Sequence, residues 1–182
     1  GLKSHPEYKK QSIDEVFKQE KALLRPVGRQ FDGYVEKTLR ASSTCLVQYD
    51  SNHYSVPSVY AKQFLSLRAY AHSIAIYADQ QQVALHPRCF GKHEYLFEPW
   101  HYVPLLKEKP GALRDGAPFK QWELSKEIDT IKRLYLKRAN GDRDFVELLQ
   151  LVQIHNIELV AKACQLAIDE KTTQLSAIIN LV

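Results

Sequence analysis

The sequence has few of the residues that build disulfide-stapled, zinc-bound or membrane-spanning proteins. Its three cysteines, Cys45, Cys89 and Cys164, lie far apart and match neither a zinc motif nor a disulfide framework. Dispersed thiols in odd number are typical of a reducing compartment, and we expect each to be a small buried apolar residue. No apolar run is long enough to cross a bilayer, and no signal-peptide pattern stands at the N-terminus.

Catalytic signatures are missing as well. The P-loop, GxGxxG, HExxH and GxSxG patterns do not occur, and none of the seven histidines is paired with another at metal-ligand spacing. Asp14, Glu15 and Glu20 gather on one short predicted helix, where a solvated face near the helix N-terminus explains them. We therefore expect no catalysis by this chain alone, and no metal or other cofactor bound to it.

What remains is an ordinary globular composition with a mild basic excess. The 182 residues are 45% hydrophobic and 25% charged, which suits one or two soluble domains. A net charge of +4 is compatible with nucleic-acid binding without requiring it. Methionine is absent and the chain begins with Gly1, so we expect it to be a piece of a longer protein.

Residues 34–87 carry the clearest pattern. Short β-branched and aromatic runs alternate with polar residues, and turn-forming clusters such as 50–52 separate them. The first run places Glu36 and Arg40 on one face and Lys37 and Leu39 on the other. Several strands at this spacing predict a small antiparallel β-barrel of about six strands.

The rest of the chain is predicted to be α-helical or extended, which makes the whole an α+β chain of several parts. A capping-box pattern at Ser12 and Glu15 starts a short helix, and a stripe of Ile128, Ile131 and Tyr135 marks the first of several later helices. The predicted parts are a linker helix from an upstream catalytic domain (1–30), the β-barrel (31–90), an extended arm with one short helix (91–125) and a small antiparallel helical bundle (126–182).

Basic residues interleaved with Asn52, Tyr54 and Tyr95 are the candidate contacts for a phosphate backbone. Residues 34–87 hold four lysines and arginines against three acidic residues, so an ordinary solvated surface remains an alternative. A protein-interaction module and a small-ligand barrel also remain open, although no spacing indicates a polar pocket. The candidate DNA-binding residues are Lys37, Arg40, Lys62, Arg68, Arg88, Lys92, Lys107, Lys109 and Arg114.

Three longer motifs carry a resemblance to a known family. They are FDGYVEKTLRASSTCLVQYDSNHYSVP (31–57), HPRCFGKHE (86–94) and WHYVPLLKEKPGALRDGAPF (100–119). In order and spacing they resemble the C-terminal region of IstA-type transposases, which come from bacterial insertion sequences that also encode an AAA+ helper ATPase. The NxYSVP core and the KPGALRxGAPF segment are the most specific signals, with Asp115 where asparagine is usual, and GDRDFVELLQLV (141–152) also fits.

The resemblance implies a position downstream of an RNase H-like domain whose Asp-Asp-Glu triad binds two divalent metal ions such as Mg²⁺. No residue of this chain matches that triad, so the resemblance implies a non-catalytic portion. Its β-barrel, like that of phage Mu transposase, would bind DNA non-specifically, and its helices would support transpososome assembly. The implied partners are DNA, other transposase protomers and the helper ATPase, in the bacterial cytoplasm and away from membranes. The alternative is a protein-interaction module, for oligomerisation or helper recruitment, without DNA contact.

Overall fold

The computed structural model describes residues 3–7, 9–21, 23–24 and 32–182. These fall into two units, Gly1–Gly33 and Tyr34–Val182. The first unit holds α1 (Ile13–Lys21), which begins with the predicted capping box. The Ser12 main-chain N–H donates to Glu15 Oε2 at 2.8 Å, and the Glu15 N–H donates to Ser12 Oγ at 3.2 Å. Within the predicted 1–30 linker, residues 1–2, 8, 22 and 25–30 lie outside the described part.

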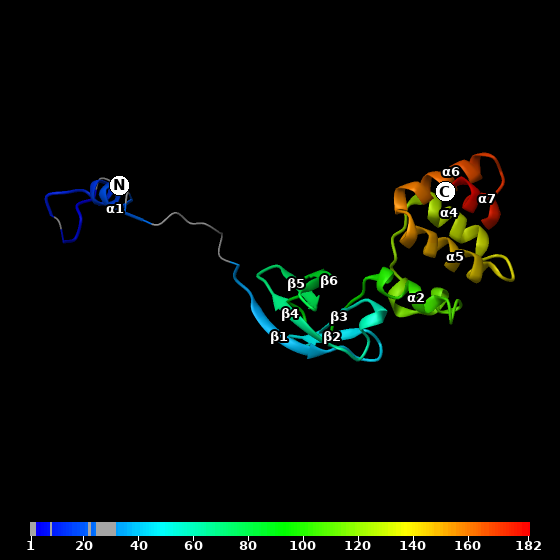
Figure 1. Cartoon of the computed structure of the whole chain (residues 1–182), viewed down its shortest axis with the longest axis horizontal. Coiled ribbons are helices and arrows are strands. Elements are labelled where there is room, and N and C mark those ends of the chain that lie inside the picture. Colours follow the sequence, from blue (N-terminus) through cyan, green and yellow to red (C-terminus); the bar gives the residue numbers. More distant parts are fainter. Residues whose placement is uncertain (1–2, 8, 22, 25–31) are drawn as a thin grey trace. The chain divides into compact units, whose positions relative to one another are not determined.

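The larger sheet of the second unit is antiparallel and four-stranded, in the order β1-β4-β5-β6 (Figure 1). In β4, Leu65, Leu67 and Ala69 are buried while the residues between them are more exposed, which is the period of a half-buried strand. A two-residue turn at 79–80, with positive φ at both positions, joins the last two strands. The strands are β1 (Val35–Arg40), β4 (Phe64–Ala69), β5 (Ser73–Ala78) and β6 (Gln81–Pro87).

A smaller sheet has three strands in the order β2-β3-β7. The hairpin of β2 (Leu46–Tyr49) and β3 (Asn52–Ser55) turns at Asp50 and Ser51, as the turn cluster in the sequence predicts, and both residues have positive φ. The third strand, β7 (Tyr95–Leu96), pairs parallel with β3 after a long crossing of the chain.

The predicted closed barrel is wrong. The described strands form two open sheets, with β1 and β6 at the edges of one and β2 and β7 at the edges of the other. The alternating pattern specifies one buried face for each strand, and two separate sheets satisfy that requirement as well as a closed sheet does. Closure depends on which edges pair, and the parallel addition of a two-residue strand is not encoded in strand periodicity.

The arm expected at 91–125 contains more helix than predicted. One short helix was expected in this segment, whereas the structure has four. Pro99, Pro104 and Pro118 each stand in the first turn of a short helix, where the fixed φ of proline and its missing N–H are tolerated. The helices are η2 (Pro99–His101), α2 (Val103–Leu106), α3 (Ala112–Asp115) and η3 (Ala117–Phe119).

Four helices follow, and α4 packs on α5 and α6 while α7 packs on the same two helices (Figure 1). The predicted stripe is confirmed, since Ile128, Ile131 and Tyr135 are fully buried on α4. Position 141, the first residue of α5, is glycine because a side chain there would overlap the Tyr135 carbonyl group. The helices are α4 (Lys126–Tyr135), α5 (Gly141–Ile154), α6 (Ile157–Asp169) and α7 (Leu175–Leu181).

Candidate nucleic-acid interface

The NHYSVP motif forms β3, and its polar side chains fasten the segment that follows β6. Asn52 is fully buried, and its Nδ2 donates to the carbonyls of Cys89 at 3.1 Å and Gly91 at 2.9 Å. Its Oδ1 accepts from the Glu94 N–H at 3.1 Å. Tyr54 adds a bond from the Cys89 N–H to its phenolic oxygen at 3.1 Å. The motif is therefore structural at these positions, because it places β7 beside β3.

Two histidines meet at Ser55, which is also buried. Nε2 of His86 lies 2.7 Å from the Ser55 carbonyl oxygen, which can only accept, so this nitrogen carries the proton. Nδ1 of His101 lies 2.9 Å from Ser55 Oγ, which accepts from the Glu98 N–H. Burial, and then the neighbouring His86, lower the pKa of His101 to about 4, so both rings are neutral near pH 7.

Three of the predicted DNA-contacting arginines bind other parts of the chain. Arg68 pairs with Glu36 at 3.3 Å and lies over the rings of Tyr34 and Tyr77. Arg88 donates to the Tyr70 carbonyl at 3.0 Å and pairs with Asp50 at 3.0 Å. Their guanidinium groups stabilise the fold and offer little to phosphate.

Arg114, from the KPGALRDGAPF motif, is the third. Its Nε lies 2.8 and 3.0 Å from the two carboxylate oxygens of Asp142, and its Nη2 donates to the Leu136 carbonyl at 2.8 Å. Asp142 belongs to the GDRDFVELLQLV motif, so this contact joins two of the family motifs. We assign Arg114 to the attachment of α3 to the start of α5.

Arg40 and Lys62 are brought together, as a phosphate site requires. Arg40 ends β1, and its Nε donates to the Lys62 carbonyl at 2.9 Å while its guanidinium carbon lies 5.8 Å from the ring centre of the exposed Phe64. With Ser42 and Ser43 they line an open recess of about 380 Å³. In the described part of the chain, no carboxylate pairs with either side chain.

The two serines of this recess are functional candidates that the sequence reasoning missed. Ser42 Oγ is occupied, since it accepts from the main-chain N–H groups of Thr44 at 3.2 Å and Leu46 at 3.1 Å. Ser43 is exposed beside it. The one available signal was a run of hydroxyl residues directly after a strand that ends in arginine, and such a run is also common in ordinary turns.

The remaining candidates do not join this recess. Lys37 lies on the opposite face of β1, as the alternation predicts, with its Nζ 5.1 Å from the ring centre of Tyr49. Lys107 and Arg143 line a separate recess together with Glu108 and Glu147, so two basic and two acidic residues balance one another there. Lys92 and Lys109 are exposed, and no hydrogen bond or ion pair within the described residues connects their side chains to Arg40 or Lys62.

Metal-binding clusters and membrane-spanning helices are both absent from the described residues. No group of three or more His, Cys, Asp or Glu side chains is arranged to hold a metal ion there. None of the helices in that part of the chain has the length and apolar character needed to span a membrane.

Comparison of the sequence with known proteins shows what the chain is similar to. Residues 26–98 match the Mu transposase C-terminal domain. The chain is also 40% identical over 183 residues to the transposase for insertion sequences IS1326/IS1353 of Pseudomonas aeruginosa, an alignment that covers 98% of this chain and 36% of that protein. The chain matches the C-terminal region of an IstA-type transposase. The resemblance carried by its sequence motifs is thereby confirmed.

A second relative agrees with this identification of a transposase C-terminal region. A transposase of Aminobacter aminovorans is 35% identical over 176 residues, which cover 94% of this chain and 34% of that protein. The chain thus spans about a third of the length of the curated relatives it matches. No solved structure matches it.

Proposed function

We propose that this transposase C-terminal region holds duplex DNA by its phosphate backbone at the Arg40–Lys62 recess, without reading the base sequence. The observation that carries the proposal is the recess itself, which Arg40 and the exposed Lys62 both line, and no carboxylate of the described residues pairs with either side chain. Phosphate contacts of this kind fix the position of a duplex and carry no sequence information.

The local structure favours this role over an ordinary solvated surface. Arg40 is oriented by its bond to the Lys62 carbonyl and by Phe64, so less side-chain freedom is lost when it binds. Lys62 has a positive φ of 63°, a backbone conformation uncommon for lysine, which the turn before β4 imposes. The Arg40 side chain and the Lys62 backbone are therefore held together at one end of the β1-β4 pair.

The test is DNA binding by a double variant, Arg40→Gln with Lys62→Asn. Asparagine is chosen at 62 because it accepts a positive φ better than glutamine does. Binding to a random-sequence duplex, followed by fluorescence anisotropy at several salt concentrations, should weaken roughly tenfold at low salt, and the slope of log K against log salt should fall by about 2.

A matched control removes the same amount of positive charge by the same two types of substitution. Arg143→Gln with Lys171→Asn removes an exposed arginine and a lysine that also has a positive φ, of 56°. This variant should bind DNA almost as the parent does. Equal losses in the two double variants would show that net charge alone is responsible, and the recess would have no special role.

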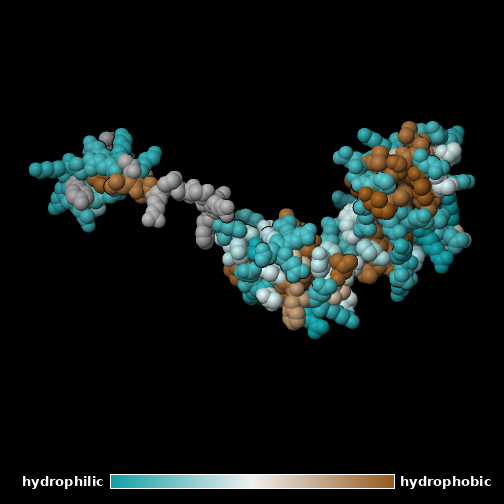
Figure 2. Space-filling model, in the orientation of Figure 1, coloured by the Kyte–Doolittle hydropathy of each residue, from teal (hydrophilic) through white to brown (hydrophobic). Residues whose placement is uncertain are grey.

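A second candidate function is protein assembly by the helices, as oligomerisation or recruitment of an AAA+ helper ATPase. Figure 2 shows apolar side chains gathered on the helical part of the surface. Leu166 is 48% exposed on α6, and Ile179 on α7 is 39% exposed. Leu166→Gln with Ile179→Gln should lower the association constant of the protomers in sedimentation while leaving DNA binding unchanged. Assembly that survives both substitutions would remove this surface from the proposal.

A further inference from the structure

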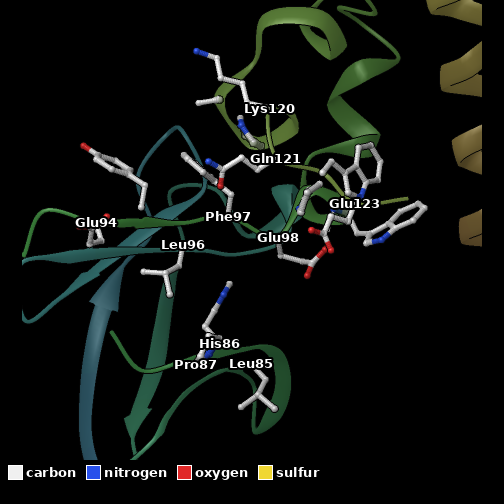
Figure 3. Close-up of a pocket in the computed structure, with 16 residues that line it drawn as sticks. Leu85, His86, Pro87, Glu94, Leu96, Phe97, Glu98, Lys120, Gln121 and Glu123 are labelled. Atoms are coloured by element: carbon white, nitrogen blue, oxygen red, sulfur yellow. Dashed lines mark hydrogen bonds between the residues drawn. The ribbon is translucent and has the colours of Figure 1, made fainter. Parts of the chain in front are cut away.

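The chain has a cleft with the opposite electrostatic character from the Arg40–Lys62 recess. It measures about 870 Å³ and is lined by the end of β6, the whole of 94–100 and residues 117–123 apart from Phe119. Figure 3 shows the labelled residues of 94–98 between Lys120–Glu123 on one side and Leu85–Pro87 on the other. We call this the β7 cleft.

The strand in this cleft has an unpaired edge. The Glu94 carbonyl accepts from the His53 N–H at 2.8 Å, and the Glu98 N–H donates to Ser55 Oγ at 2.8 Å, so alternate main-chain groups of this segment face β3. The intervening groups, those of Tyr95 and Phe97, then face away from β3. In the described part of the chain, the main-chain groups of Tyr95 and Phe97 make no hydrogen bond to other main-chain groups outside the pairing of β7 with β3. β7 is the last strand of its sheet.

Aromatic side chains form the walls of the cleft and are fixed by one another. The Tyr95 ring stacks on His53 at 4.4 Å between centroids and lies 5.9 Å from the Phe97 ring. Trp100 and Trp122 meet edge to face at 5.0 Å. A surface of rigid rings around an open strand edge suits an extended peptide, whose side chains alternate between the two faces of the strand it forms.

The charges of the cleft determine which peptide fits. Glu94, Glu98 and Glu123 line it together with one basic residue, Lys120, while the buried His86 is neutral because burial lowers its pKa. Three carboxylates against one ammonium group repel phosphate and attract lysine or arginine. DNA is therefore the wrong occupant for this surface, although the chain as a whole is basic.

We propose that the β7 cleft binds an extended basic segment of a partner protein, which adds as a strand to the free edge of β7. The main-chain groups of Tyr95 and Phe97 supply the hydrogen bonds of the new ladder. Glu94 and Glu123 pair with lysine or arginine side chains of the segment, and the aromatic walls take its apolar residues. This role is separate from DNA contact and does not depend on it.

The probe is a labelled peptide of alternating valine and lysine, about eight residues long, the length of an ordinary strand. It should bind the full chain with a Kd on the order of 100 µM. Glu94→Gln with Glu123→Gln should weaken that binding roughly fivefold, since exposed ion pairs each contribute little to affinity. The matched control, Glu147→Gln with Glu158→Gln, removes two exposed carboxylates elsewhere and should leave the affinity unchanged.

Two altered probes and one protein variant separate the parts of the proposal. A peptide of alternating valine and glutamate should not bind. The valine-lysine peptide with a central proline should bind about tenfold more weakly, because it lacks an N–H needed for the ladder. The Arg40→Gln with Lys62→Asn variant should bind the valine-lysine peptide as the parent chain does. Absence of peptide binding, equal affinity of the glutamate or proline peptide, an unchanged affinity in the Glu94–Glu123 variant, or weaker binding by the Arg40–Lys62 variant would each overturn it.

Discussion

The sheets and the helical part of residues 34–182 are stabilised by different kinds of side chain. On β3, the buried Asn52, Tyr54 and Ser55 each hydrogen-bond to the segment that carries β7 and η2. On the helices α4–α7 the buried residues are almost entirely apolar, and the buried hydroxyl of Tyr135 has no hydrogen-bond partner in the described part of the chain. Directional bonds fix where one segment lies, whereas apolar packing requires matched volume, so the two parts should respond differently to small substitutions.

The largest expected effect is at Asn52. Asn52→Ala removes two donated bonds and one accepted bond at once, and should lower the free energy of unfolding by about 3–5 kcal/mol in urea denaturation. Asn180→Ala, on the exposed surface of α7, is the control and should change it by less than about 0.5 kcal/mol. A cost at Asn52 no greater than that of the control would mean that its three bonds do not hold the segment.

A second difference between the two parts is their response to acid. The pKa of His101 is lowered to about 4 from 6.5, so the unfolded chain binds a proton more readily than the folded chain between these values. The contribution of His101 to the free energy of unfolding is therefore fully present above pH 6.5. It decreases as the pH falls toward 4 and levels off below that. The half-buried position of His101 limits the loss to about 1–3 kcal/mol.

Two variants assign that pH dependence to the buried pair of histidines. His101→Asn keeps an acceptor near Nδ1 but cannot be protonated, so the slope of stability between pH 6.5 and 4 should decrease, with the His86 contribution remaining. His155→Asn, at the exposed end of α5, should leave the slope intact. If the slope follows His155 instead, the buried pair is not its source.

The sequence predicted features that depend on local periodicity and turn chemistry. The hairpin turn at 50–51 and the stripe of α4 are both found in the structure, because each follows from residues close together in the chain. The prediction of a barrel is wrong, because closure depends on pairing between distant edges. The arm has more helix than expected, because three prolines stand in the first turns of short helices.

The candidate site shows the same division between local and long-range information. All nine basic residues look alike in sequence, yet the hydrogen-bond partners of Arg68, Arg88 and Arg114 lie 18 or more positions away. Only the fold reveals which charges are already neutralised. Arg40 and Lys62, 22 positions apart, are likewise joined by the pairing of β1 with β4.

The smallest expected effect is also the sharpest test of the comparison, because it deletes one hydroxyl group from each part. Tyr54→Phe leaves the Cys89 N–H without its acceptor and should destabilise the chain by about 1–2 kcal/mol. Tyr135→Phe removes a hydroxyl that lacks a partner in the described residues, at a site where burial raises its pKa to about 12, and should be neutral or stabilise by up to about 1 kcal/mol. Thermal unfolding of the two variants measures the opposite signs directly. Equal destabilisation would show that Tyr135 finds a partner in solution, and the helical part would then also contain a buried hydrogen bond.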